Sequence, residues 1–408
     1  MKKLIPVILL TFVNTLNFSV MIPILPFIVN RFGGGPIMYG VLLSVYPFFQ
    51  FFAAPILGSL SDRYGRRPIL LISQAGTALS WVIFIASAYA PAWYWGPISL
   101  PLVIMLVARI ADGITGGNGS VANAYLTDCT TREEKTKAFG ILGGVIGIGL
   151  IVGPAVGGIF MSTEWGYLAP IYLTFLISVI TLIVMYTSLR ESLPSTLRKK
   201  DVHFDLGKEL QLLPKMQKYM SNRRIKYLFF MRTVFLFVFG SFSAIFVLFM
   251  IDVFKLSSKE IGFLFVLVGG FIFVNQAIIA GKMAKKYGDL NTYLVGQGAI
   301  IVSQLMYGFI TSLPLFIPVM YLNNFGLSIS MASFKSLLSK SVSDAQQGEI
   351  MGIDESMFAA SSAVSPLLAT FLYTFFGAFT FALQAVILII GMLIFWYRKG
   401  WRKEPYNS

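Results

Sequence analysis

Six charged residues interrupt long apolar stretches of this 408-residue chain: Arg109, Asp112, Arg232, Lys335, Asp354 and Glu355. A charge in hydrocarbon costs about 2.5–3.5 kcal/mol or more, so such residues are kept where they pair, relay protons or line a cavity. The six charges sum to zero, which is compatible with complete pairing. The chemistry open to them is ion pairing, proton exchange on a carboxylate, and the anchoring of a charged or zwitterionic ligand.

Arg109 and Asp112 are three residues apart and are therefore neighbours on one face of a helix. They lie about 16–21 Å into their span at about 1.5 Å per residue, which is near the bilayer midplane. In one interpretation, Asp112 alternately holds a proton and pairs with Arg109, so a conformational change that separates them moves a proton. In the other, they form a local ion pair without further function.

The other four charges come to one depth, about 9–10 Å from the cytoplasmic ends of their helices by the same rise. They form either a structural cluster or gate, or a second titrating site at Asp354 or Glu355. Adjacent residues cannot share a helix face. We therefore expect one of these carboxylates to pack toward Lys335 and the other toward the cavity or Arg232.

The composition indicates that the bilayer is the solvent for these charges. The chain is 56% hydrophobic and 12% charged, with a mean hydropathy of +0.75, whereas soluble domains carry about 25% charged residues. We expect an all-α membrane protein. The net charge of +14 is attributed to basic cytoplasmic loops and not to nucleic-acid binding.

The residue inventory excludes several classes of site. The single cysteine, Cys129, rules out an intramolecular disulfide, and the single histidine, His203, lies in a charged loop, so no histidine metal site is available. The sequence contains no Gly-x-x-x-x-Gly-Lys-Ser/Thr phosphate loop and no set of residues for hydrolysis. We expect no metal, no cofactor and no enzymatic activity.

Apolar runs of about 20 residues, the length that crosses a bilayer, occur twelve times. They cover roughly 4–27, 38–61, 68–90, 98–127, 136–160, 167–188, 226–251, 259–283, 290–311, 314–340, 349–373 and 376–398. A polar interval divides them six and six. This division predicts an N-terminal bundle at 1–189, a cytoplasmic linker at 190–225 and a C-terminal bundle at 226–408. The linker segment from Leu206 to Tyr219 is either an amphipathic helix on the inner leaflet or a solvated tether.

Basic residues are distributed unevenly between the two sides of the membrane. With the N-terminus inside, 26 of the 32 Lys and Arg residues fall on the inner side and 3 on the outer side. This bias predicts that both termini are cytoplasmic in a plasma or inner membrane.

Two loops indicate an internal repeat. The loop after the second span, from Gly58 to Pro68, reads Gly-Ser-Leu-Ser-Asp-Arg-Tyr-Gly-Arg-Arg-Pro. The loop after the eighth span, from Gly281 to Gly288, keeps the glycine spacing but has Lys285 where the first has Asp62. Parallel repeats of this kind place a substrate site between two halves near the midplane. Because only the first loop keeps its carboxylate, we expect the two loops to act asymmetrically.

The fifth span carries the motif Gly149-Leu-Ile-Val-Gly-Pro-Ala-Val-Gly-Gly158. A spacing of four residues places Gly149, Gly153 and Gly157 on one face, where another backbone can approach closely. Pro154 removes one helix hydrogen bond and permits a bend. Together with Gly158, these residues form either a moving interface or an ordinary packing surface.

Three segments resemble motifs of the major facilitator superfamily, and most of all of its tetracycline-efflux-like drug:proton antiporters. They are the loop from Gly58 to Pro68, the motif from Gly149 to Gly158, and the segment Arg109-Ile-Ala-Asp-Gly-Ile-Thr-Gly116. The resemblance implies twelve transmembrane helices in two six-helix pseudo-repeats that export a small amphipathic compound by alternating access. It also implies that Asp62, Arg66 and Asp128 form a gate that locks one conformation. The other interpretation is that these three residues only set the topology.

One position departs from that group. Tetracycline exporters carry an Asp in the first helix, nine residues before a proline that matches Pro23, and here the residue is Asn14. A neutral amide cannot carry a proton at physiological pH. This departure argues against tetracycline as the substrate and against the usual proton site of the group. The expected coupling pair is Asp112 with Arg109.

Polar and aromatic residues within the spans are candidates for lining a substrate cavity, although each is also typical of helix packing. The candidates are Asn14, Asn17, Arg232, Phe235, Gln276, Asn324 and Lys335. We expect a monomer whose partners are a small-molecule substrate, protons and the lipid bilayer. The alternatives are a transporter of an endogenous metabolite, zwitterion, anion or lipid-like molecule, and a membrane receptor that has lost transport.

Overall fold

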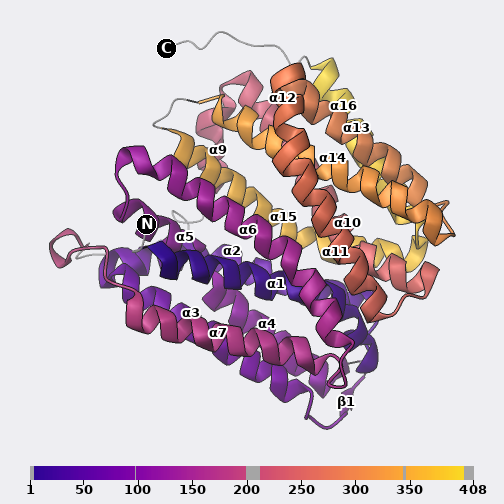
Figure 1. Cartoon of the computed structure of the whole chain (residues 1–408), viewed down its shortest axis with the longest axis horizontal. Coiled ribbons are helices and arrows are strands. Elements are labelled where there is room, and N and C mark those ends of the chain that lie inside the picture. The colour runs from indigo at the N-terminus through magenta and orange to yellow at the C-terminus, as the bar shows by residue number, and fades with distance from the viewer. Residues whose placement is uncertain (1–3, 97, 199–211, 343–345, 399–408) are drawn as a thin grey trace. The chain divides into compact units, whose positions relative to one another are not determined.

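The computed structural model describes residues 4–96, 98–198, 212–342 and 346–398 (Figure 1). Within these residues, eleven helical segments are long and apolar enough to cross a membrane. Helix α13 (Asp289–Tyr307) is a twelfth segment of 19 residues, and its Gln297 and Ser303 are hydrogen-bonded to α14. The predicted all-α fold with twelve membrane helices is therefore confirmed.

The chain divides into two compact units, residues 1–210 with 257–266 and residues 211–256 with 267–408. The first unit contains α1 (Ile5–Arg31), α2 (Pro36–Tyr64), α3 (Arg66–Ser87), α4 (Leu100–Gly116), α5 (Gly119–Asp128), α6 (Arg132–Met161) and α7 (Leu168–Ser188). Two-residue strands, β1 (Tyr94–Trp95) and β2 (Ile98–Ser99), pair in the loop before α4. A 3₁₀ turn, η2 (Ser195–Leu197), follows α7.

The second unit contains α9 (Leu212–Met220), α10 (Arg223–Phe254), residues 267–274 of α11 (Ser258–Val274), the π-helix η3 (Asn275–Ala280), α12 (Gly281–Tyr287), α13, α14 (Leu313–Ser339), α15 (Gln347–Phe376) and α16 (Phe379–Tyr397). Helix α9 packs against α10 and α15. Part of the predicted linker, residues 199–211, lies outside the described residues, as do most of the predicted cytoplasmic termini. The boundaries at 189 and 226 stay a prediction.

Two predicted spans are interrupted in the structure. The span expected at 98–127 breaks between α4 and α5, where the Gly116 carbonyl accepts a hydrogen bond from Gln50 Nε2 at 3.0 Å and the Thr115 carbonyl accepts one from Ser73. Carbonyls freed by such a break in a membrane helix must find partners on neighbouring helices. The span expected at 259–283 contains η3, a π-helical segment between α11 and α12.

Packing within the first unit brings α3 against α4 and α7, and α1 against α6 (Figure 1). In the second unit, α10 packs against α15, and α13 packs against α14 and α16. An aromatic cluster fills the space between α10, α13, α14 and α16. Its members include Phe242, Phe246, Tyr307, Phe316 and Phe381.

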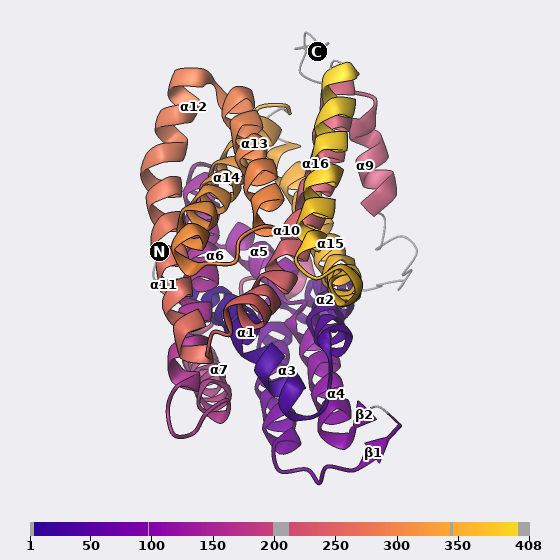
Figure 2. The same ribbon diagram turned by 90° about the vertical axis from the view of Figure 1, so that its right-hand side faces the viewer.

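The two repeated loops have the same backbone geometry. Gly65 has φ +105° and Gly288 has φ +81°, a region that glycine adopts without steric cost. The Gly65 N–H donates to the Ser61 carbonyl at 3.1 Å, and the Gly288 N–H donates to the Ala284 carbonyl at 2.9 Å. Gly288 lies between α12 and α13, which are neighbouring helices in Figure 2.

Candidate functional site

Helix α4 holds Arg109 and Asp112 side by side in the interior of the first unit. Arg109 Nη1 lies 3.4 Å from Asp112 Oδ2, and the two side chains are 2% and 9% exposed. Arg109 is also held by α2, because its Nε donates to the Leu42 carbonyl at 3.4 Å and its guanidinium lies 4.7 Å from the centre of the Tyr46 ring. Strong charge-assisted hydrogen bonds measure about 2.7–2.9 Å. This ion pair is therefore long, and its cation has further contacts on α2.

Two asparagines of α1 link this region to the neighbouring helices. Asn14 Nδ2 donates to Asn118 Oδ1 at 2.8 Å, and Asn118 Nδ2 donates to Ser73 Oγ at 2.7 Å, which joins α1, the α4–α5 break and α3. Asn17 Nδ2 donates to Ser178 Oγ on α7 at 2.8 Å. Both candidate cavity residues thus make hydrogen bonds between helices. Contact with a substrate stays a prediction for both.

In the second unit, Arg232 and Asp354 form a short bidentate ion pair. Arg232 Nε donates to Asp354 Oδ1 at 2.6 Å and Nη2 donates to Oδ2 at 2.8 Å. The guanidinium lies 4.7 Å from the ring centre of Phe334 and 5.6 Å from that of Phe235. The pair joins α10 to α15, and its side chains are only 3% and 4% exposed.

Glu355 lies outside that ion pair. Its side chain and that of Lys335 are both exposed in the second unit, whereas Asp354 is buried. The pairing of one carboxylate with Lys335 stays a prediction. Of the remaining cavity candidates, Gln276 is exposed, whereas Asn324 is buried and donates from Nδ2 to the Met320 carbonyl at 2.8 Å.

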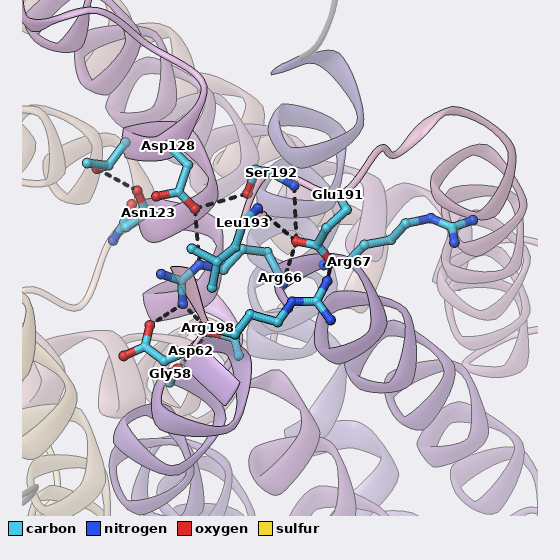
Figure 3. A network of polar contacts seen from close by, with 12 residues as sticks. Gly58, Asp62, Arg66, Arg67, Asn123, Asp128, Glu191, Ser192, Leu193 and Arg198 are labelled. Atoms are coloured by element: carbon cyan, nitrogen blue, oxygen red, sulfur yellow. Dashed lines mark hydrogen bonds and ion pairs between the residues drawn. The ribbon is translucent and has the colours of Figure 1, made fainter. Parts of the chain in front are cut away.

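The structure brings together the three predicted gating residues at the ends of α2, α3 and α5 (Figure 3). Arg66 Nη1 lies 2.5 Å from Asp62 Oδ1, and Arg66 Nε lies 3.2 Å from Asp128 Oδ2. Arg66 Nη1 also donates to Ser61 Oγ at 2.6 Å. Arg66, at the start of α3, is therefore the centre of the network.

The segment after α7 completes this network, and the sequence analysis did not identify it. Glu191 accepts hydrogen bonds from the backbone N–H groups of Arg66 at 2.9 Å and Arg67 at 3.2 Å, so its carboxylate caps α3 (Figure 3). Ser192 Oγ donates to Asp128 Oδ2 at 3.0 Å. The sequence contained one indication of this cap. Gly65, which precedes α3, has no side chain that could cap the helix, and an acidic residue, Glu191, follows the sixth span.

The glycines of the fifth span face α1. A Cβ added at Gly153 would overlap Ser19, one added at Gly157 would lie 2.6 Å from the Val20 carbonyl oxygen, and one added at Gly149 would lie 3.0 Å from Thr15 Cβ. Gly158 instead lies against Gly262 near the start of α11. Pro154 lies within α6, among the glycines that permit this close packing.

A helical fold with twelve membrane-length segments, repeated loops and paired charges inside both units is typical of a polytopic membrane transporter. The chain belongs to the Major Facilitator Superfamily, whose sequence model matches residues 7–353 and 228–408.

Named relatives agree with this assignment. The chain is 30% identical to the class H tetracycline resistance protein of Pasteurella multocida, over 93% of this chain and 90% of that protein. It is 29% identical to the class C protein of Escherichia coli, over 82% and 80% of the two chains. A crystal structure of the human organic anion transporter MFSD10 shares the fold, with a TM-score of 0.70 and 21% identity over 96% of this chain and 98% of that one.

Proposed function

We propose that this transporter is a proton-coupled antiporter that exports small amphipathic compounds by alternating access. The observation that carries the proposal is the Arg109–Asp112 pair, a carboxylate and a guanidinium inside α4 separated by 3.4 Å. The similarity to tetracycline resistance proteins supports export as the direction. The 26-to-3 bias of basic residues supports a cell membrane with both termini in the cytoplasm.

In this mechanism Asp112 is the group that binds the proton. Protonation removes its charge and ends its attraction to Arg109, which stays held by the Leu42 carbonyl and the Tyr46 ring. Deprotonation restores the ion pair. A carboxylate that changes partner between two conformations can exchange protons with opposite sides of the membrane, which is the requirement for antiport.

The other carboxylates have different roles in this proposal. Asp354 is held by two short hydrogen bonds from Arg232, so we assign it to the stability of the α10–α15 contact. Glu355 is exposed and is the stronger candidate for a second titrating site. We assign to the cytoplasmic gate Asp62, Arg66 and Asp128. We assign the face of α6 that packs against α1 to the helix contact that moves during transport.

The test is exchange driven by a pH gradient in proteoliposomes that contain the purified protein. Substrates are first identified by thermal stabilisation with a panel of amphipathic cations, anions and tetracycline. Asp112→Asn should abolish pH-driven transport, at least about tenfold below wild type, while substrate binding persists. Glu164→Gln, which changes an exposed loop carboxylate, is the matched control and should leave transport unchanged. Undiminished pH-driven transport by Asp112→Asn would refute the coupling assignment.

A further inference from the structure

A small cavity lined by buried residues lies beside the proposed proton site, between α3 and α4. It measures about 10 Å³ and is lined by Ser80, Trp81, Phe84, Ala108, Arg109 and Asp112. A cavity of about 10–15 Å³ is the smallest that holds one water molecule. Its lining is mixed, because the indole, guanidinium, hydroxyl and carboxylate groups lie beside the apolar side chains of Phe84 and Ala108.

Two of the lining residues carry N–H groups that have no hydrogen-bond partner among the described residues. These atoms are Trp81 Nε1 and Arg109 Nη2, and each side chain is 2% exposed. A buried N–H left without an acceptor costs about 1–3 kcal/mol. Both donors therefore require an acceptor, and the cavity is the space that both residues share.

The chemistry of the lining selects the occupant. A water molecule makes two to four hydrogen bonds in a buried polar site, and this site supplies two donors and the acceptor oxygens of Asp112 and Ser80. An anion would meet the Asp112 carboxylate in the same small space. A metal cation would meet the Arg109 guanidinium, which cannot act as a ligand.

We propose that one ordered water molecule occupies this cavity, accepts hydrogen bonds from Trp81 and Arg109, and donates one to the Asp112 carboxylate. Trp81 is then a positioning residue, because it orients the water that solvates the proton site. The role in coupling rests on the proposed function, whereas the water site itself does not. The titratable groups that face Asp112 are Arg109 on its own helix and Tyr46 on α2, and α3 contributes the hydroxyl of Thr77.

Trp81→Phe removes the indole N–H and keeps an aromatic ring at this position. The readout is the infrared difference spectrum of the full-length protein between acidic and neutral pH, recorded in ordinary water and in ¹⁸O-labelled water. Wild type should show a water O–H band that shifts with the label, and Trp81→Phe should lose it. Trp165→Phe, at a side chain 64% exposed, is the matched control and should retain it. Persistence of the band in Trp81→Phe would overturn the proposal.

Transport and structure give two further readouts. Loss of one hydrogen bond should slow pH-driven exchange about three- to tenfold in Trp81→Phe, with no change in Trp165→Phe. If Trp81→Phe does not fold, a high-resolution map of the wild-type protein decides. Density within about 3.2 Å of both Trp81 Nε1 and Arg109 Nη2 supports the water, and its absence refutes it. Should Asp112→Asn keep pH-driven exchange while this density is present, the coupling mechanism fails and the water site stands.

Discussion

At the residue scale, the two intramembrane ion pairs differ in the way that their proposed roles require. Arg232 and Asp354 are joined by hydrogen bonds of 2.6 and 2.8 Å, whereas the Arg109–Asp112 separation is 3.4 Å. A short bidentate pair has a fixed geometry. A long pair whose cation has other partners can separate at a lower cost. The shorter pair therefore suits a structural contact, and the longer one suits a group that binds and releases protons.

The buried pair predicts a specific stability pattern. Asp354→Ala should destabilise the protein by about 3–5 kcal/mol, because it leaves the Arg232 guanidinium buried and without its anion. Lys335→Ala removes an exposed charge and should change stability by no more than about 0.5 kcal/mol. Replacing both partners, as in Arg232→Met with Asp354→Leu, should recover most of the loss. Thermal unfolding of the purified variants in one detergent provides the comparison, and equal losses for Asp354→Ala and Lys335→Ala would contradict it.

The sequence predicted that one carboxylate lies toward Lys335 and the other toward the cavity or Arg232, but not which of the two meets Arg232. Counting residues from helix ends placed Arg232, Lys335, Asp354 and Glu355 at one level, as the rise of a helix allows. Which carboxylate meets Arg232 depends on the rotation of α15 about its axis, and packing against other helices sets that rotation. The role of Trp81 could not be predicted from the sequence, because a tryptophan in an apolar span usually serves helix packing. Its unpartnered nitrogen is visible only once α3 and α4 are placed together.

At the element scale, the α1–α6 contact shows how a local pattern can predict a packing face. A spacing of four residues put Gly149, Gly153 and Gly157 on one side of α6, and in the structure all three meet α1. The break between α4 and α5 was not predictable in this way. Its free carbonyls are satisfied by Gln50 and Ser73 from other helices, which are contacts that no local pattern encodes.

Substitution of single glycines in α6 tests this packing face. Gly153→Ala should destabilise the protein by about 1–3 kcal/mol, because the new methyl group overlaps Ser19 and forces the helices apart. Gly147→Ala is the matched control on the same helix, since its methyl group meets nothing within 4 Å. The control should be neutral or stabilising by up to about 1 kcal/mol. Thermal unfolding and the rate of exchange should be measured together, and a Gly153→Ala protein as stable as the control would argue against close packing here.

At the scale of the whole molecule, the two repeated loops share one backbone geometry and carry opposite charges in their ion pairs. Arg66 follows Gly65 of the first repeated loop and pairs with Asp128 at the end of α5. Asp289 follows Gly288 of the second repeated loop and pairs with Lys340, directly after α14, at 2.6 Å. The ion pair therefore recurs at the corresponding position with its charges exchanged. The repeat was predictable from the glycine spacing, but this second pair was not, because Lys340 lies about 50 residues from its partner.

The two pairs should respond differently when their charges are exchanged. Asp289→Lys with Lys340→Asp should destabilise the protein by no more than about 1 kcal/mol, because Lys340 is 68% exposed although Asp289 is 12% exposed, and exposed pairs contribute about 0.2–1 kcal/mol. The protein with Arg66→Asp and Asp128→Arg should lose several-fold more stability than the protein with the Asp289 and Lys340 exchange. Arg66 is 9% exposed, and it also binds Asp62, which would then face a second carboxylate.

Double-mutant cycles with alanine at each position measure the coupling within each pair directly. The coupling between Arg66 and Asp128 should exceed that between Asp289 and Lys340 by at least about 1 kcal/mol, since burial strengthens the electrostatic interaction. Transport assays on the same proteins then locate the gate. An asymmetric gate requires that only the first charge exchange slows transport. If both exchanges slow it equally, the two loops act as equivalent gates, and the loss of the carboxylate at Lys285 has no mechanical consequence.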